Sequence, residues 1–302
     1  MGKESMHALV ERFATAEGAT DTAVPGLQLY RIAAPLQRTP AVYTPRICVN
    51  TQGAKRVFSS TGVHVYDRTH FICCTIPAPV QVHVPDASPD RPVMGVSIEL
   101  ETSPFLELIR AFAVTRGPGC DPQPKAPTPQ GLATGLMSDR LEDAIRRLLA
   151  LLDDPTACHA LAQGRLTEVY FALLTGPLGP VIRRRFGPSQ KIADSICFLQ
   201  DHLTESVSID QLARWAGMSR ATFHRRFKET TGMAPIQFVK ELRLNSAAMR
   251  LAEGMRTGEA AEAVGYHSPS QFSREFKRQF GQSPKDWATG SGSEMPVDSM
   301  SR

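Results

Sequence analysis

Two short segments near the C-terminus carry side chains that can hydrogen-bond DNA bases and phosphates. In the first, Phe223 and Phe227 stand one helical turn apart, so a helix that buries both turns His224 and Arg225 outward. An outward arginine can donate to guanine O6 and N7 together, which is typically worth about 1–3 kcal/mol of base discrimination. This arrangement predicts a helix that lies in a DNA major groove.

The second segment repeats the first. Residues 212–235 have the sequence LARWAGMSRATFHRRFKETTGMAP, and residues 260–284 have the sequence AAEAVGYHSPSQFSREFKRQFGQSP. Gly217 corresponds to Gly265 at an offset of 48, whereas Pro235 corresponds to Pro284 at an offset of 49, so the second copy has one extra residue in its turn. A repeat this regular indicates two copies of one helix-turn-helix unit.

The expected DNA contacts lie on the outward side of the second helix of each copy. Among them Arg225, His224, Gln271 and Arg274 are the favoured base readers, because their side chains can bond base edges. The full set of candidates is Arg220, Ala221, Thr222, His224, Arg225 and Lys228 in the first copy, and Pro269, Ser270, Gln271, Ser273, Arg274 and Lys277 in the second.

Capping residues fix where these helices begin. Ser208 with Gln211 predicts a capping box at the first helix of copy one, and Ser219 is the expected cap of its second helix. In copy two, Ser268 is the expected cap, Pro269 takes the first helical position, and Gln271 is expected to complete a second capping box.

Positive charge is concentrated in the same region. Residues 208–287 hold 13 Lys and Arg against 8 Asp and Glu, a net +5, while the whole chain is +4, so the remainder sums to −1. A basic surface attracts phosphates, which favours nucleic acid as the partner. Between the copies, residues 235–252 predict a helix of roughly 24 Å, long enough to place two recognition helices about one DNA turn apart.

Residues 190–288 resemble the DNA-binding domain of the AraC/XylS family of bacterial transcriptional regulators. The stretch VGYHSPSQFSREFKRQFGQSP at 264–284 carries the resemblance most specifically, although Ala260 stands where the family usually has a larger aliphatic residue. The resemblance implies a regulator with two helix-turn-helix subdomains that bind double-stranded DNA in adjacent major-groove segments. It also implies transcriptional activation through contacts with RNA polymerase.

The N-terminal half has a different pattern. Short runs rich in β-branched and aromatic residues alternate with turn residues, which predicts a small β-barrel or sandwich; the expected strands are 27–32, 42–50, 56–59, 64–66, 71–76, 80–84 and 94–100. The stretches 44–58, 71–81 and 92–100 resemble the N-terminal domain of an AraC subgroup, which implies a cupin-like barrel. The expected fold class is therefore α+β, with a barrel followed by an all-α double helix-turn-helix.

Five segments make up the expected domain organisation: a helical lead-in over 1–24, a sensory barrel over 25–115, a helical dimerisation and linker region over 130–186, the DNA-binding domain, and a disordered tail over 289–302. The five prolines of 117–129 predict an exposed loop, and Arg183–Arg185 begin an expected linker. The helix 137–152 has a continuous apolar stripe, which either pairs with a second copy in a homodimer or packs on its own barrel.

Three hypotheses concern the barrel. In the first, it binds a small-molecule effector, since a barrel interior is a natural pocket. In the second, it senses electrophiles or oxidants through Cys48, Cys73 or Cys74. The adjacent Cys73 and Cys74 should face opposite sides of one strand. An enzyme is the least favoured, because cupin enzymes carry an HxH metal motif and this chain has none. We therefore expect no catalytic residue, no metal and no cofactor.

Composition sets the broad class. The chain has 302 residues, ordinary hydrophobic and charged fractions of 42% and 21%, and no apolar run of the ~20 residues that cross a bilayer. Six cysteines without regular spacing are typical of reduced thiols in a cytosolic protein. These features predict a cytoplasmic protein without a membrane partner.

Overall fold

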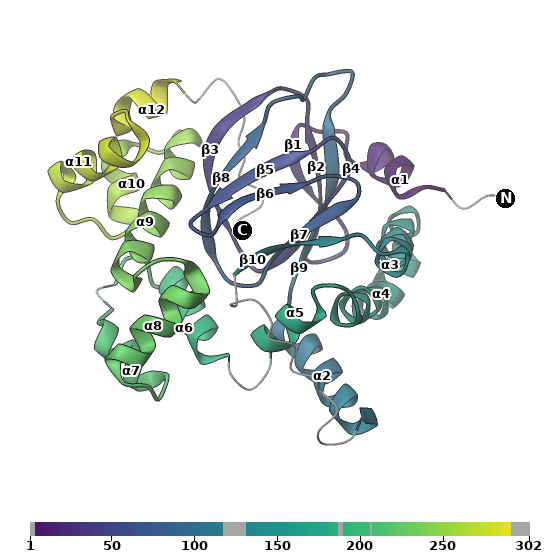
Figure 1. The fold of residues 1–302 in the computed structure, drawn as a ribbon. Coiled ribbons are helices and arrows are strands. Elements are labelled where there is room, and N and C mark those ends of the chain that lie inside the picture. The colour runs from purple at the N-terminus through teal and green to yellow at the C-terminus, as the bar shows by residue number, and fades with distance from the viewer. Residues whose placement is uncertain (1–3, 117–130, 187–189, 206, 291–302) are drawn as a thin grey trace.

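The computed structural model describes residues 4–116, 131–186, 190–205 and 207–290. Two β-sheets form the centre of the N-terminal half, one group of helices covers one side of it, and a second, C-terminal group lies against the other side (Figure 1). This arrangement confirms the expected α+β class. The proline-rich loop and all of the predicted tail beyond residue 290 lie outside the described residues.

The two sheets are antiparallel throughout. The six-stranded sheet has the order β1 (Gly18–Asp21), β2 (Leu27–Ile32), β9 (Val93–Glu99), β4 (Arg46–Gln52), β7 (His70–Cys74) and β10 (Leu132–Leu136). The four-stranded sheet has the order β3 (Leu36–Tyr43), β8 (Ala78–Val84), β5 (Lys55–Ser59) and β6 (Gly62–Tyr66). Their facing sides enclose one apolar core that includes Val57, Ile72 and Val82.

The barrel takes more strands than the sequence predicted. The expected strand 42–50 is two strands, because the chain turns between Tyr43 and Arg46. Strand β3 contains Pro40, which an edge strand tolerates since one row of its amides pairs with no neighbour. Strands β1 and β10 fall outside the expected range 25–115, and both are too short to show a clear alternation of apolar and polar residues.

Helices α1 (Met6–Phe13), α2 (Thr102–Arg116), α3 (Asp139–Leu149), α4 (Pro155–Thr175) and α5 (Gly179–Phe186), with the 3-10 turn η1 (Ala150–Asp153), belong to the N-terminal half. The apolar stripe of α3 is buried: Leu141, Ile145 and Leu148 share a core with Val49 and Val96 of the six-stranded sheet. The stripe therefore packs on its own barrel, and its burial there argues against a homodimer formed by this apolar face.

Helix α5 corrects a second expectation. Arg183–Arg185 lie within it and do not form a linker. Arg185 is buried, and its guanidinium group contacts both halves of the molecule, as described below.

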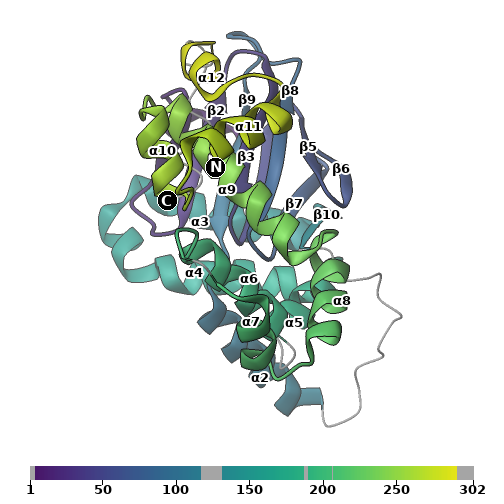
Figure 2. The same cartoon turned by 90° about the vertical axis from the view of Figure 1, so that its left-hand side faces the viewer.

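The C-terminal helices form two similar units on one connecting helix. The first unit contains α6 (Lys191–Asp201), α7 (Ile209–Trp215) and α8 (Arg220–Thr231); the second contains α10 (Thr257–Ala263), α11 (Pro269–Phe280) and α12 (Pro284–Gly290). Helix α9 (Pro235–Ala252) joins them, with the predicted bounds. The two units lie toward opposite ends of α9 (Figures 1 and 2), and each has its own apolar core.

Candidate nucleic-acid interface

Helix α8 is stabilised by the cap and the buried phenylalanine pair that the sequence predicted. Ser219 caps it by accepting from the Thr222 amide at 3.3 Å. Phe223 and Phe227 are completely buried with ring centroids 5.7 Å apart, and Phe227 meets the ring of Phe238 on α9 edge-on at 5.4 Å. With these rings fixed inward, the other faces of α8 are left for a partner.

The polar side chains of α8 lie mostly in solvent. The Arg225 side chain is 64% exposed and pairs with Glu229 at 3.0 Å, while Arg220 pairs with Asp210 at 3.2 Å. Exposed ion pairs of this kind contribute only about 0–1 kcal/mol, so both arginines can exchange their carboxylates for DNA. Of the remaining candidates in this copy, Ala221 and Lys228 are exposed, and His224 and Thr222 are half-buried.

Thr222 has a structural use. Its hydroxyl accepts a hydrogen bond from the Ser219 hydroxyl at 3.0 Å, and its amide donates to the same Ser219 oxygen. These two bonds build the start of α8, which makes Thr222 a weaker candidate for base contact than Arg225.

Helix α11 repeats this construction with one difference. Ser268 caps it through the Gln271 amide at 3.3 Å, and Pro269 occupies the first turn. The Gln271 side chain donates to Glu275 at 3.4 Å and does not return to the cap, so the expected capping box is absent here, whereas the box of Ser208 and Gln211 forms at α7. The candidates Ser270, Gln271, Arg274 and Lys277 are exposed, Pro269 is exposed, and Ser273 is half-buried.

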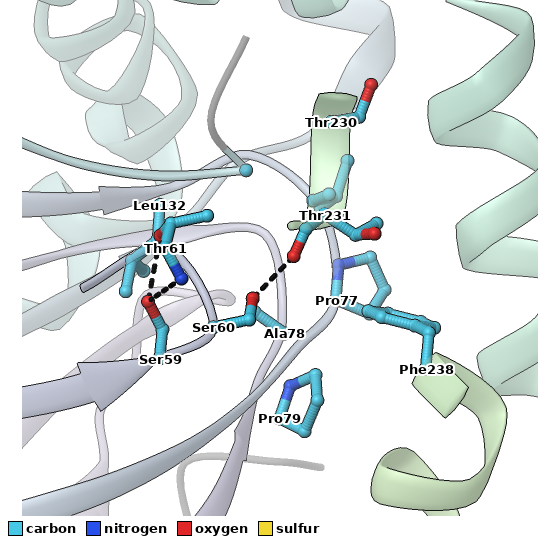
Figure 3. Close-up of a pocket in the computed structure, with 12 residues that line it drawn as sticks. Ser59, Ser60, Thr61, Pro77, Ala78, Pro79, Leu132, Thr230, Thr231 and Phe238 are labelled. Carbon is cyan, nitrogen blue, oxygen red and sulfur yellow. Dashed lines mark hydrogen bonds between the residues drawn. The ribbon is translucent and has the colours of Figure 1, made fainter. Parts of the chain in front are cut away.

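The C-terminal end of α8 is bonded to the barrel. The Ser60 hydroxyl, in the tight turn between β5 and β6, donates to the carbonyl oxygen of Thr231 at 2.5 Å, and the Gly131 amide donates to that of Thr230 at 3.2 Å. Figure 3 shows Ser60 and Thr231 facing one another, beside Pro77, Pro79 and Phe238. A cavity of only about 20 Å³ remains among these groups, enough for about one water molecule.

Helix α9 extends this contact along the four-stranded sheet. It packs on β3 and β8, and two barrel residues, Val42 and Ile76, belong to the apolar core of the first helix-turn-helix unit. Buried Arg185 adds a polar bond: its Nε donates to the Thr75 carbonyl at 2.7 Å, and its Nη1 lies 3.6 Å from Asp194 on α6. The barrel and the first unit therefore share a packed, hydrogen-bonded interface that the sequence did not reveal.

The three candidate sensor thiols are inside the protein. Cys73 lies in the core under the helices, and Cys74 and Cys48 lie in the barrel core, so the adjacent pair does face opposite sides of the sheet. Burial raises the pKa of Cys73 to about 12 and also raises the pKa of Cys48 and of Cys74. Reactive thiols need accessibility and a depressed pKa, so these surroundings argue against the electrophile-sensor hypothesis.

A polar cluster that the sequence analysis missed lies inside the barrel. The Lys55 side chain, on a residue only 1% exposed, places its Nζ 3.4 Å from the ring centroid of Tyr30. Burial lowers the pKa of Lys55 to about 8, and among the described residues no carboxylate pairs with it. The hydroxyls of Tyr43 and Tyr66 are also buried without a hydrogen-bond partner in the described structure. Lys55 lies two residues before Val57 on β5, so both side chains point to the same, inner face of the strand. This spacing could have predicted from the sequence that Lys55 is buried.

Within the described ranges, no three His, Cys, Asp or Glu side chains gather as a metal-binding group would require. In the same residues no helix combines the length and the apolar character needed to cross a membrane.

Comparison with known families gives two matches. Residues 23–181 match the family described as AraC-type transcriptional regulator N-terminus, and residues 212–290 match a helix-turn-helix domain family. The first match covers more than half of the chain and includes the barrel from β2 onward, together with α2, α3 and α4.

Similar sequences and structures agree with these matches. The transcriptional activator RhaS of Escherichia coli (strain SE11) is 33% identical over 155 residues, which are 48% of this chain and 54% of RhaS. An AraC-like transcription regulator of Streptomyces antibioticus is 36% identical over 97 residues, or 32% of each chain. The matched regions thus span about a third to a half of these relatives. Fatty-acid-bound ToxT of Vibrio cholerae has the same overall fold, with a TM-score of 0.53 at 12% identity over 87% of this chain and 94% of ToxT.

Proposed function

The chain belongs to the AraC family of transcriptional regulators, and from this premise we propose that α8 and α11 enter two adjacent major-groove segments of one operator. The observation that carries the proposal is the repeated unit itself: two capped helices, each with a buried phenylalanine pair and outward polar residues, on one rigid connecting helix. Arg225, His224, Gln271 and Arg274 are the proposed base readers, and Lys228 and Lys277 bind phosphates.

Selection of bound fragments from random DNA by the purified protein, at a stated salt concentration, tests this proposal. We expect one motif with two conserved segments about one helical turn apart. Binding that depends on salt but enriches no motif would contradict base readout by either helix.

Activation is the proposed direction of regulation, supported by the similarity to the RhaS activators. In this proposal the bound protein contacts RNA polymerase at a neighbouring promoter. Transcription from the selected motif in a reconstituted system should rise when the protein is added. A fall in transcript would identify a repressor.

The barrel is the proposed effector site, and Lys55 indicates the chemistry of the effector. A buried ammonium group without a carboxylate partner is costly, and a ligand carboxylate would supply the missing charge. The unpartnered hydroxyls of Tyr43 and Tyr66 lie in the same core and offer donors to such a group. The fatty acid bound by ToxT, which shares this fold, supports an acyl carboxylate as the first candidate.

Thermal unfolding with oleate and with its methyl ester tests the effector proposal. We expect oleate to raise the unfolding temperature of the wild-type protein but not of Lys55→Met, because only the acid pairs with the ammonium group. Equal stabilisation by the ester, or of the variant, would contradict a role for Lys55.

A further inference from the structure

A groove of about 560 Å³ separates the two helix-turn-helix units. One wall comes from α6 and the start of α7, and the other comes from the turn before α11 and its first residues. The base is one face of α9, where Ile236, Val239, Lys240 and Arg243 follow helical spacing. Its volume lies within the range of roughly 300–1,000 Å³ that small-molecule sites occupy.

Aliphatic side chains form one part of the lining, beside polar and charged residues that include His202, Glu205 and His267. Leu199, Val207 and Ile209 line the wall of the first unit, and Val239 and Ile236 line the base. Ile236 is 69% exposed, which leaves its surface accessible to an occupant. This aliphatic part of the lining suits the body of an apolar molecule.

One cation of the groove is neutralised within the protein. The Lys240 ammonium group lies 3.3 Å from Glu275, and the same carboxylate accepts a hydrogen bond from the Tyr266 hydroxyl at 2.9 Å. Burial raises the pKa of Glu275, but these bonds and that from Gln271 together hold it below its usual value. The Glu275 carboxylate is therefore ionised and fully engaged.

Arg243 is the cation without a counter-ion. Its Nη2 donates to the main-chain oxygen of Glu205 at 3.1 Å, while its Nε is buried with no hydrogen-bond partner in the described structure. Among the described residues no carboxylate pairs with this guanidinium group. An unused buried donor on a charged group costs free energy, and a carboxylate matches a guanidinium group in both charge and shape.

We propose that this groove binds a small organic acid whose apolar body contacts the aliphatic lining and whose carboxylate accepts from Arg243. Such an acid touches both helix-turn-helix units and lies against Gln271, one of the proposed base readers. Its binding therefore lowers the affinity of the protein for operator DNA. The site is distinct from the barrel and lies in the other half of the chain.

Calorimetric titration of the full chain with 2-naphthoate and octanoate, each beside its amide, tests the site directly. The Lys55→Met protein is used, so that the proposed barrel site does not contribute. Both acids should bind at micromolar to millimolar concentration, and each amide should bind about tenfold more weakly, because it has no negative charge and one oxygen fewer to accept from Arg243.

Two variants and a control assign the binding to the groove. Arg243→Met should weaken the acids about tenfold, and Ile236→Ala, at an exposed position where folding is little affected, should weaken acid and amide alike. Arg250→Met removes another half-buried arginine of α9 outside the groove and should bind as the parent does.

Binding of neither acid, or equal binding by Arg243→Met, would overturn the proposal. Loss of DNA affinity in Arg243→Met without any acid binding would show that the groove holds the DNA backbone, which also overturns it. Because the titration contains no DNA, its result does not depend on the proposed operator readout. A shift in operator affinity with added acid is measured afterwards, and it must disappear in Arg243→Met.

Discussion

At the scale of single residues, substitutions of Arg225 and Lys228 distinguish base reading from phosphate binding. Arg225→Ala should weaken binding to the selected operator by about 1–3 kcal/mol and relax base preference at one position, because its bidentate bond to guanine is lost. Lys228→Ala should weaken all sequences alike and reduce the salt slope by about 1. Competition binding at several salt concentrations distinguishes the two variants, and Arg250→Ala on α9 is the control. Unchanged site preference in Arg225→Ala would remove it from the readers.

Lys55 gives a second residue-scale prediction, in pH dependence. Its folded pKa of about 8 lies below the ordinary value of 10.5, so between these values the unfolded chain binds more protons. Its destabilising effect is therefore complete below pH 8 and is relieved as pH rises toward 10.5. Lys55→Met should be more stable at neutral pH, by up to about 3 kcal/mol. The difference between the two proteins in urea unfolding should shrink as pH rises through this window; a constant difference would contradict a depressed pKa.

At the scale of elements, α8 and α11 both end on a glycine, and the same substitution at each glycine can be compared. Gly232 and Gly281 both cap their helices in the left-handed region, at φ +76° and +78°. A Cβ at Gly281 meets nothing within 4 Å, whereas at Gly232 it would lie 2.9 Å from the Ser60 hydroxyl oxygen. Gly281→Ala should cost about 1–2 kcal/mol of backbone strain alone. Gly232→Ala should cost more and also loosen the barrel contact, measured by urea unfolding and by proteolysis; equal costs would mean that this contact is easily displaced.

Elements differed in how far the sequence specified them. The caps at Ser208, Ser219 and Ser268 were predictable because a cap depends on residues within three positions of itself. The start of α9 was predictable because Pro235 occupies its first turn. Strand β10 depends instead on pairing with β7, some 60 residues away, and its own five residues carry little periodicity. The Lys55 cluster and the groove were missed for the same reason, since each is assembled only by tertiary packing.

At the scale of the whole molecule, the barrel and the first helix-turn-helix unit should unfold together. Arg185→Ala removes the buried bonds to Thr75 and Asp194, so calorimetry should resolve two transitions in the variant and one in the wild type. Arg183→Ala is the matched control, because within the described ranges the hydrogen bond of Arg183 goes to the Leu174 carbonyl of its own half. Two transitions already present in the wild-type protein would show that the interface does not couple the halves.

The bonds that tie the barrel to α8 end on main-chain oxygens, those of Thr230 and Thr231. No outward side chain of the recognition helix takes part in them, so substitution of His224 or Arg225 leaves them in place. Operator preference can therefore diverge, or be engineered, while the connection of α8 to the barrel is inherited unchanged. In this architecture the residues that face DNA and the residues that join the two halves can change independently.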